Sequence, residues 1–141
     1  MNILVTGSSG HLGEALVRHL RDVGHRVAGL DLMPSPWTDL VGSIADRNFV
    51  RNAMRGFGAV VHSATLHQPH LATHSKSLFV ETNVSGTLNL LEAAAGRVGV
   101  FLFTSTTSVF GRAMTPSNGR AVWVTEELAP IPRNASRLER V

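Results

Sequence analysis

Three glycines at a spacing of three, Gly7, Gly10 and Gly13, follow a short apolar run that is rich in β-branched residues. In such a turn Gly7 permits a tight bend, Gly10 lets backbone approach a pyrophosphate, and Gly13 allows close packing of the following helix on the strand. The N-terminus of that helix offers unpaired N–H groups and a positive dipole to phosphates. We therefore expect a dinucleotide-binding turn, and a glycine turn without a ligand is the alternative.

An acidic residue, Asp31, ends the next apolar run of the chain. At the end of a second strand, its carboxylate can accept hydrogen bonds from the two hydroxyls of an adenosine ribose, and it would repel a 2′-phosphate. No arginine occurs between Asp31 and Arg47 to neutralise such a phosphate. The sequence therefore favours NAD over NADP as cofactor. A surface or capping role for Asp31 is the competing interpretation.

The hydrophobic pattern predicts strands that alternate with helices. Short apolar runs indicate five strands, at 2–6, 26–30, 40–42, 59–62 and 98–103. Apolar residues at helical spacing indicate a helix that ends at Gly24, a short helix capped by Asp46, and a long helix over 75–95 whose apolar stripe lies against a sheet. This alternation predicts a doubly wound α/β fold with about five parallel strands in the order 3-2-1-4-5 and helices on both faces. The cofactor crevice would lie at the carboxyl edge, between the first and fourth strands.

Length and composition narrow the possible classes of protein. At 141 residues, with 43% hydrophobic and 16% charged residues, the chain suits one globular domain. The absence of cysteine excludes disulfides and thiolate chemistry and suits a reducing cytoplasm. The net charge of +3 comes from scattered arginines and only 6% of the residues are aromatic, so we expect no nucleic-acid partner. No apolar run approaches the ~20 residues of a membrane helix, so we expect no membrane partner either.

Several segments, taken in order, resemble motifs of the extended short-chain dehydrogenase/reductase family, in particular its NAD-dependent epimerase/dehydratase branch. Segment 6–13 is similar to the glycine signature of that family, and Asp31 stands at its acidic position. Segment 42–46 resembles the part that contacts adenine, although a serine stands where the family usually has aspartate. Segment 60–64 resembles the fourth-strand motif near the nicotinamide half of the cofactor, and 83–94 is close to the long helix of the extended members.

This resemblance implies an NAD(P)-binding Rossmann domain and a set of residues that contact the cofactor. They are Gly7, Ser9, Gly10, His11, Leu12, Gly13, Asp31, Ser43, Ile44, Ser63, Ala64, Thr65, Asn83 and Thr104. At Ser43 a hydroxyl would replace the usual carboxylate that faces adenine. The implied cofactor is NAD, with NADP less favoured, and the implied substrate is a nucleotide sugar or a related hydroxy compound.

The catalytic residues of the family are only partly present. Segment 103–111 resembles the fifth-strand motif with the catalytic hydroxyl, which falls by position on Thr106, with Ser105 as the near alternative. The family also uses a tyrosine acid/base and a lysine one helical turn later, but this chain contains no tyrosine. Alignment places Ser136 and Arg140 at these two positions. Neither can take over the role, because an alkyl hydroxyl titrates far above neutral pH and a guanidinium does not deprotonate in proteins.

Family members also have a sixth strand and a C-terminal lobe that selects the substrate, and we expect neither within these 141 residues. The chain therefore divides into a Rossmann core over 1–111 and a loop and tail over 112–141. Two functions stay open, and the sequence does not decide whether the chain is an enzyme. It is either the NAD-binding portion of an epimerase/dehydratase or related oxidoreductase, with weak or no activity of its own, or a non-enzymatic dinucleotide-binding sensor or scaffold module.

Two other features concern metals and partners. His62, His67, His70 and His74 cluster in the sequence, but no acid or cysteine lies between His62 and Glu81 to complete a site, so we expect no metal. The predicted fifth strand would leave backbone groups unpaired at the sheet edge. We therefore expect a homodimer, or packing of the tail over that edge.

Overall fold

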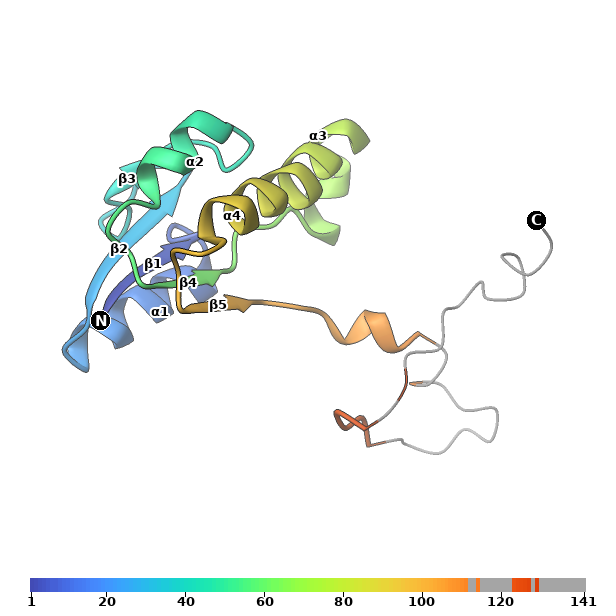
Figure 1. Cartoon of the computed structure of the whole chain (residues 1–141). Helices are drawn as coiled ribbons and strands as arrows, with labels where there is room; N and C mark the ends of the chain where they lie inside the picture. Colours follow the sequence, from blue (N-terminus) through green and yellow to red (C-terminus); the bar gives the residue numbers. More distant parts are fainter. Residues whose placement is uncertain (112–113, 115–122, 128, 130–141) are drawn as a thin grey trace. The chain divides into compact units, whose positions relative to one another are not determined.

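The computed structural model describes residues 1–111, 114, 123–127 and 129 (Figure 1). The chain divides into two compact units, Met1–Thr104 and Ser105–Val141. The first unit contains the sheet and the helices that pack on it. The second unit contains a short 3-10 helix, η3 (Thr107–Phe110). None of the described helices is long and apolar enough to cross a membrane.

Five parallel strands form one sheet in the order β3-β2-β1-β4-β5, which confirms the predicted fold. The strands are β1 (Asn2–Thr6), β2 (Arg26–Asp31), β3 (Leu40–Val41), β4 (Ala59–His62) and β5 (Val100–Phe103). The fifth strand starts later than predicted because the Val98 N–H still bonds to the Ala94 carbonyl in the turn after the last helix. The strand order reverses at β1, so a crevice is expected at the carboxyl edge between β1 and β4.

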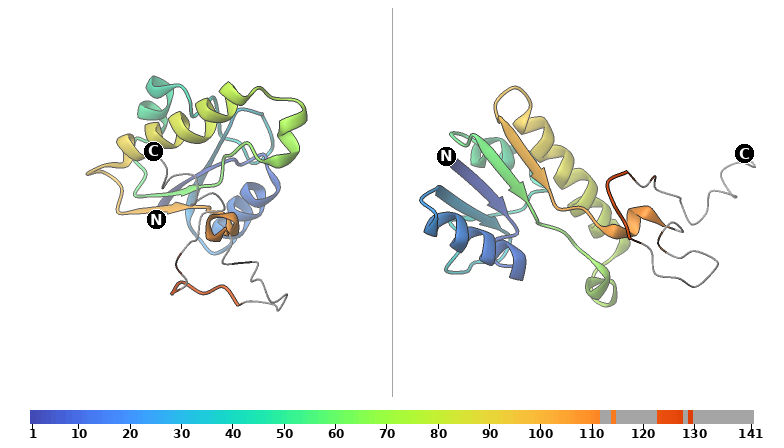
Figure 2. Two further views of the ribbon diagram at one scale, coloured as in Figure 1. Left: turned by 90° about the vertical axis from the view of Figure 1, so that its right-hand side faces the viewer. Right: turned by 90° about the horizontal axis from the view of Figure 1, so that it is seen from below.

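Helices cover both faces of the sheet (Figures 1 and 2). The helices of the first unit are α1 (His11–Asp22), α2 (Arg47–Ala53), the 3-10 helix η1 (Gln68–Ala72), α3 (Lys76–Val80), the π-helix η2 (Glu81–Gly86) and α4 (Thr87–Ala94). Helix α1 lies on one face, and α2 and α4 lie on the other. The predicted cap of α2 is confirmed, because the Asp46 carboxylate accepts hydrogen bonds from two N–H groups of the first turn.

Alternate residues of β1 point to two separate hydrophobic cores. Ile3 and Val5 pack with Val17 of α1 on one face. Leu4 packs on the other face, where Leu90 of α4 belongs to the same buried cluster. This alternation follows from the period of two along a strand. The sheet is therefore buried on both sides around β1, the strand next to the expected crevice.

The long helix predicted over 75–95 differs from the structure in two ways. Its middle is the π-helix η2, and much of the predicted apolar stripe does not face the sheet. Four of its members are between 37% and 60% exposed: Leu78, Val84, Leu88 and Leu91. The helix instead packs through Leu90 and small residues, and a Cβ at Gly86 would lie only 2.7 Å from Ile44 Cγ1. The stripe prediction is confirmed for Leu90 and Ala94, which are buried, and was wrong for the four exposed residues. Close approach at small residues, rather than side-chain size, selects the buried face.

Candidate cofactor site

The glycine turn lies between the ends of three strands. Gly7 has φ +78°, a backbone conformation that strongly favours glycine. Its N–H donates to the Leu30 carbonyl of β2 over 2.8 Å. A Cβ on Gly7 would lie 2.8 Å from the Ala64 nitrogen just beyond β4. The turn therefore needs glycine both for its conformation and for its close contact with the segment that follows β4.

The turn leads directly into the N-terminus of α1. Gly10 caps this helix without a side chain that could accept hydrogen bonds from the first turn. The first N–H groups of a helix have no intrahelical partner, and exposed His11 and Leu12 carry two of them. A Cβ on Gly13 would lie 1.8 Å from the Gly7 carbonyl oxygen, so the first turn of the helix packs closely on the glycine turn. Further along α1, Val17 packs on Ile3 and Val5 of the first strand. An uncapped, positive helix end suits phosphate groups.

Asp31 lies against the same turn. Its Oδ2 accepts a hydrogen bond from the Ser9 N–H over 3.1 Å, and its Oδ1 accepts one from the Met33 N–H over 2.9 Å. Each carboxylate oxygen can accept a second hydrogen bond. Asp31 belongs to none of the ion pairs among the described residues. Its charge therefore stays available to ribose hydroxyls beside the phosphate turn.

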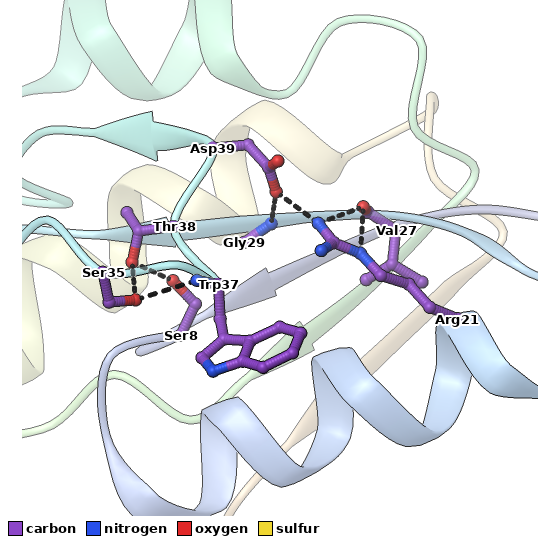
Figure 3. A network of polar contacts seen from close by, with 8 residues as sticks. All are labelled: Ser8, Arg21, Val27, Gly29, Ser35, Trp37, Thr38 and Asp39. Carbon is purple, nitrogen blue, oxygen red and sulfur yellow. Dashed lines mark hydrogen bonds and ion pairs between the residues drawn. The ribbon is translucent and has the colours of Figure 1, made fainter.

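The loop after Asp31 is held in place by a polar network that the sequence analysis missed (Figure 3). Ser8 Oγ and Thr38 Oγ1 are 2.8 Å apart, which ties the loop to the glycine turn. Asp39 Oδ2 accepts hydrogen bonds from the Gly29 N–H and from Arg21 Nη2, each over 2.7 Å. A Cβ on Gly29 would lie 1.9 Å from the Trp37 carbonyl oxygen. No sequence periodicity signals these contacts, because they join a loop to residues far away in the chain.

The ends of β1 and β4 are joined at the crevice. Ser63 Oγ donates to the Thr6 carbonyl over 2.7 Å, and the Ala64 N–H donates to Thr6 Oγ1 over 3.3 Å. Thr104, which follows β5, donates its N–H to the His62 carbonyl over 3.0 Å. The predicted site residues Ser63, Ala64 and Thr104 therefore lie along one edge of the sheet.

The π-helix η2 brings Asn83 to the loop that follows β4. The Leu66 N–H donates to Asn83 Oδ1 over 2.8 Å, and Asn83 Nδ2 donates to the Leu66 carbonyl over 2.7 Å. Thr65 Oγ1 donates to the same Oδ1 over 3.2 Å. Segments of π-helix often occur at functional sites. Thr65 and Asn83, both predicted site residues, are therefore in direct contact.

The segment expected to face adenine is anchored by the side chains of Ser43, Ile44 and Asn89. Ser43 Oγ accepts a hydrogen bond from the Ala45 N–H over 3.1 Å. Ile44 is 5% exposed, and its side chain belongs to the hydrophobic core. Asn89 Nδ2 donates to the carbonyls of Ile44 and Ala45, a contact that the sequence analysis did not identify. Contacts of Ile44 with a cofactor would therefore fall to its backbone.

His62 does not share the environment of the other histidines. It is 1% exposed, and burial lowers its pKa from 6.5 to about 4. His67, His70 and His74 lie apart from it, with ring centroids 4.6 and 5.3 Å from one ring to the next. Among the described residues, no group of three or more histidine and acidic side chains could hold a metal ion. The sequence cluster is thus split into one buried ring and three rings that meet edge to face.

The candidate catalytic residues belong to the second unit. Ser105 and Thr106 are exposed and precede η3, where the Thr106 carbonyl accepts a hydrogen bond from the Val109 N–H over 3.3 Å. Ser136 and Arg140 lie outside the described residues. The catalytic role of Thr106 or Ser105, and the placement of Ser136 and Arg140 at the tyrosine and lysine positions, therefore stay predictions.

A cavity of about 440 Å³ occurs away from the crevice residues. Arg51, Arg55 and Arg97 contribute to its lining. Arg51 lies in the last turn of α2, Arg55 follows that helix, and Arg97 follows α4. Cationic side chains stabilise the carbonyl-rich C-terminal ends of helices. The two helix ends therefore account for this group of arginines.

The sequence matches the model of a known protein family. The model of the NAD dependent epimerase/dehydratase family matches residues 3–133, which is most of the chain. The chain belongs to this family. The family match spans the glycine turn, Asp31 and the segment with Thr106.

Known relatives place this epimerase/dehydratase chain among longer proteins. It is 36% identical to a 2-alkyl-3-oxoalkanoate reductase of Stenotrophomonas maltophilia, with 84% of the chain and 37% of the relative covered. It matches a short-chain dehydrogenase/reductase superfamily protein from Agrobacterium tumefaciens with bound NAD at a TM-score of 0.78 and 35% identity, with 94% and 39% covered. It matches the Thermus thermophilus UDP-glucose 4-epimerase in complex with NAD at a TM-score of 0.76 and 30% identity, with 94% and 45% covered. The chain thus spans less than half the length of each of these proteins.

Proposed function

We propose that this chain is the NAD-binding portion of an oxidoreductase of the epimerase/dehydratase family, with its core over 1–111. The observation that carries the proposal is the contact between the Ser9 N–H and Asp31 Oδ2. It places a ribose acceptor directly beside an uncapped helix N-terminus, so one ligand with a phosphate next to a ribose can meet both. The NAD-bound state of two similar proteins supports this assignment.

NAD is the proposed cofactor, in preference to NADP. Asp31 would repel a 2′-phosphate, and no ion pair among the described residues neutralises it. Gly7, Ser9, Gly10, His11, Leu12 and Gly13 would surround the phosphates. Ser43 and Ile44 would lie on the adenine side, and Ser63, Ala64, Thr65, Asn83 and Thr104 on the nicotinamide side. Titration calorimetry with NAD and NADP tests the preference, and equal affinities would contradict it.

The reaction proposed for the whole protein is the interconversion of a hydroxyl-bearing carbon and a carbonyl, in which the hydroxyl proton would go to an acid/base group, the role of the family tyrosine that this sequence lacks. Bound NAD supplies a nicotinamide ring that accepts or returns the hydride. Thr106, or Ser105 beside it, would donate or accept a hydrogen bond at the reacting oxygen of the substrate. A nucleotide sugar or a related hydroxy compound is the proposed substrate class, since one similar protein is a UDP-glucose 4-epimerase. Because the chain is also similar to an oxoalkanoate reductase, simpler hydroxy compounds should be tested as substrates beside nucleotide sugars.

We expect the 141-residue chain to bind cofactor with weak or no turnover. The sequence contains no tyrosine, and neither Ser136 nor Arg140 can act as acid/base near neutral pH. NAD reduction, followed by absorbance across a panel of nucleotide sugars and hydroxy acids, should stay at background. The double variant Ser136→Tyr with Arg140→Lys should also stay inactive if substrate contacts come from outside this chain. Turnover by the unmodified chain above background would refute a non-enzymatic module.

The missing tyrosine also favours a second candidate function, a non-enzymatic module that binds a dinucleotide as sensor or scaffold. Both candidates predict saturable NAD binding, so binding alone does not separate them. A longer open reading frame that encodes further strands beyond Val141 would favour the enzyme. A stop codon directly after Val141 would favour the module.

A homodimer is the proposed assembly, with an apolar part of the sheet edge as the contact. Phe101 packs into the core beneath α2 and α4, so Val100 and Leu102 point to the opposite face. On that face α1 packs against β1 and β2. Val100 and Leu102 are 51% and 52% exposed. A second copy packed against this face at the edge strand would cover them, and packing of the tail over the edge is the other candidate.

A further inference from the structure

A chain of hydrogen bonds runs through His62 beneath the carboxyl edge of the sheet. On one side, the Ala64 N–H donates to Thr6 Oγ1, which lies 2.7 Å from His62 Nδ1. On the other side, His62 Nε2 lies 2.9 Å from Thr87 Oγ1, which donates to the Asn83 carbonyl over 2.8 Å. The chain joins the end of β1, the loop after β4, the π-helix and the first turn of α4.

These contacts determine which ring nitrogen carries the proton. The Thr87 hydroxyl has one proton and gives it to the Asn83 carbonyl, so it can only accept a hydrogen bond from His62. Nε2 is therefore the protonated nitrogen of the neutral ring. Nδ1 is then an acceptor, and the Thr6 hydroxyl donates to it. In this arrangement every polar atom in the series of hydrogen bonds through His62 has a partner.

No charged group takes part in this arrangement. The residues that contact the ring are Thr6 from β1, Thr87 from α4, and Phe101 and Phe103 from β5. No ion pair among the described residues includes His62. A second ring proton would point at Thr6 Oγ1, which already accepts from the Ala64 N–H and would then have no acceptor for its own proton. The neutral ring alone satisfies all partners.

We propose that His62 is a positioning residue, which holds the loop after β4 and the Asn83 turn in register with the glycine turn. This inference rests on the proposed function. If the phosphates lie at the glycine turn and the adenosine ribose at Asp31, on the β2 side, the other nucleoside must extend across the ends of β1 and β4. There it meets Ala64 and the loop that Asn83 holds. His62 then affects the nicotinamide half of the cofactor and leaves the adenosine half unchanged.

Comparing NAD with AMP as probes separates the two halves. AMP needs only the glycine turn and the region of Asp31. In Thr87→Val and His62→Asn the Nε2 branch is lost, and NAD affinity should fall roughly three- to tenfold, the equivalent of one neutral hydrogen bond. AMP affinity should change less than about twofold, because its contacts are untouched. Calorimetry at neutral pH gives both values.

Conservative variants and a matched control test the assignment further. Thr87→Ser keeps the hydroxyl and should retain wild-type NAD affinity. His62→Gln can still donate from its amide nitrogen to Thr87 and should bind NAD more tightly than His62→Asn. Thr73→Val makes the same chemical change as Thr87→Val on an exposed residue outside the chain of hydrogen bonds, and its NAD affinity should equal that of the wild type.

The outcomes separate this inference from the proposed function. If the wild type binds neither NAD nor AMP, the proposed function fails and the inference with it. If the wild type binds both, and the variants lose NAD and AMP equally or lose neither, only the positioning role is overturned. Long-range ¹H–¹⁵N spectra of the imidazole in the wild type require no variant to fold. A proton on Nε2 agrees with the assignment, and a proton on Nδ1 overturns it.

Discussion

The backbone N–H of Ser9 donates a hydrogen bond to Oδ2 of Asp31 over 3.1 Å. This contact joins the glycine turn after β1 to the acid that ends β2. Because the carboxylate already touches the turn, a ligand with its phosphates at the turn brings the adjacent ribose within reach of the same carboxylate. We therefore propose that these two elements act as one site for the cofactor.

Removing the carboxylate should weaken NAD binding. Hydrogen bonds to charged groups contribute about 1.5–3 kcal/mol, so Asp31→Ala should lower NAD affinity roughly 10- to 100-fold. The NAD affinity of Asp31→Asn should lie between those of the wild type and Asp31→Ala. Its ratio of NADP affinity to NAD affinity should exceed that of the wild type, because the charge that repels the 2′-phosphate is gone. Calorimetry measures each affinity. Exposed Asp22 offers a control: equal NAD affinity in Asp22→Asn and Asp31→Ala would rule out the ribose contact.

A methyl group on Gly13 should disrupt the phosphate turn. Its Cβ would lie 1.8 Å from the Gly7 carbonyl oxygen, so backbone must move. We expect Gly13→Ala to lower the free energy of unfolding by about 2 kcal/mol or more and to abolish NAD binding. Gly58→Ala is the matched control, because nothing lies within 4 Å of the added Cβ. It should change stability by less than about 0.5 kcal/mol. Similar urea midpoints for both variants would contradict the close packing.

Stability should fall as the pH decreases through the range set by His62. Burial lowers its pKa from 6.5 to about 4, so between these values the unfolded chain binds more protons than the folded chain. The contribution of the neutral His62 ring to the free energy of unfolding is complete above pH 6.5, decreases as the pH falls, and is lost at about pH 4. It amounts to about 3 kcal/mol in the free energy of unfolding. Urea unfolding at several pH values, compared with His62→Gln, isolates it, and parallel curves for the two proteins would refute the assignment.

The edge strand β5, which pairs only with β4 among the described strands, should drive self-association. Leu102 is 52% exposed on the face opposite the core of α2 and α4. We expect the wild type to form dimers with rising concentration, and Leu102→Lys to shift the equilibrium toward monomer, because a buried unpaired lysine opposes contact. Light scattering after size-exclusion chromatography gives the masses. If the wild type stays monomeric at all concentrations and its tail moves freely, neither a second copy nor the tail packs over the edge, and both proposals are excluded.

The strand order and the glycine turn could be predicted because both depend on local signals. A run of apolar residues that ends in glycine marks the first strand and its turn, and alternation with helices fixes a parallel sheet. Asp31 could be placed because it directly follows such a run. These predictions needed no knowledge of contacts between distant segments.

Other parts of the site depend on such contacts and left no periodic signal. The ring of His62 is fixed by Thr6 and Thr87, which are 56 and 25 residues away in the sequence. The π-helix that carries Asn83 has the same apolar spacing as an ordinary helix over so few residues. The exposed stripe of the long helix was misassigned because hydrophobicity identifies an apolar face, while small residues such as Gly86 determine which face packs closely.

An NAD titration followed in ¹⁵N amide spectra tests the central claim most directly. We predict saturable shifts of the amide signals on addition of NAD. They should be largest at Ser9 of the glycine turn, at His11 and Leu12 in the first turn of α1, and at Met33, whose N–H donates to the Asp31 carboxylate. Absence of saturable shifts, or shifts confined to Arg51 and Arg97 around the other cavity, would contradict the proposed site.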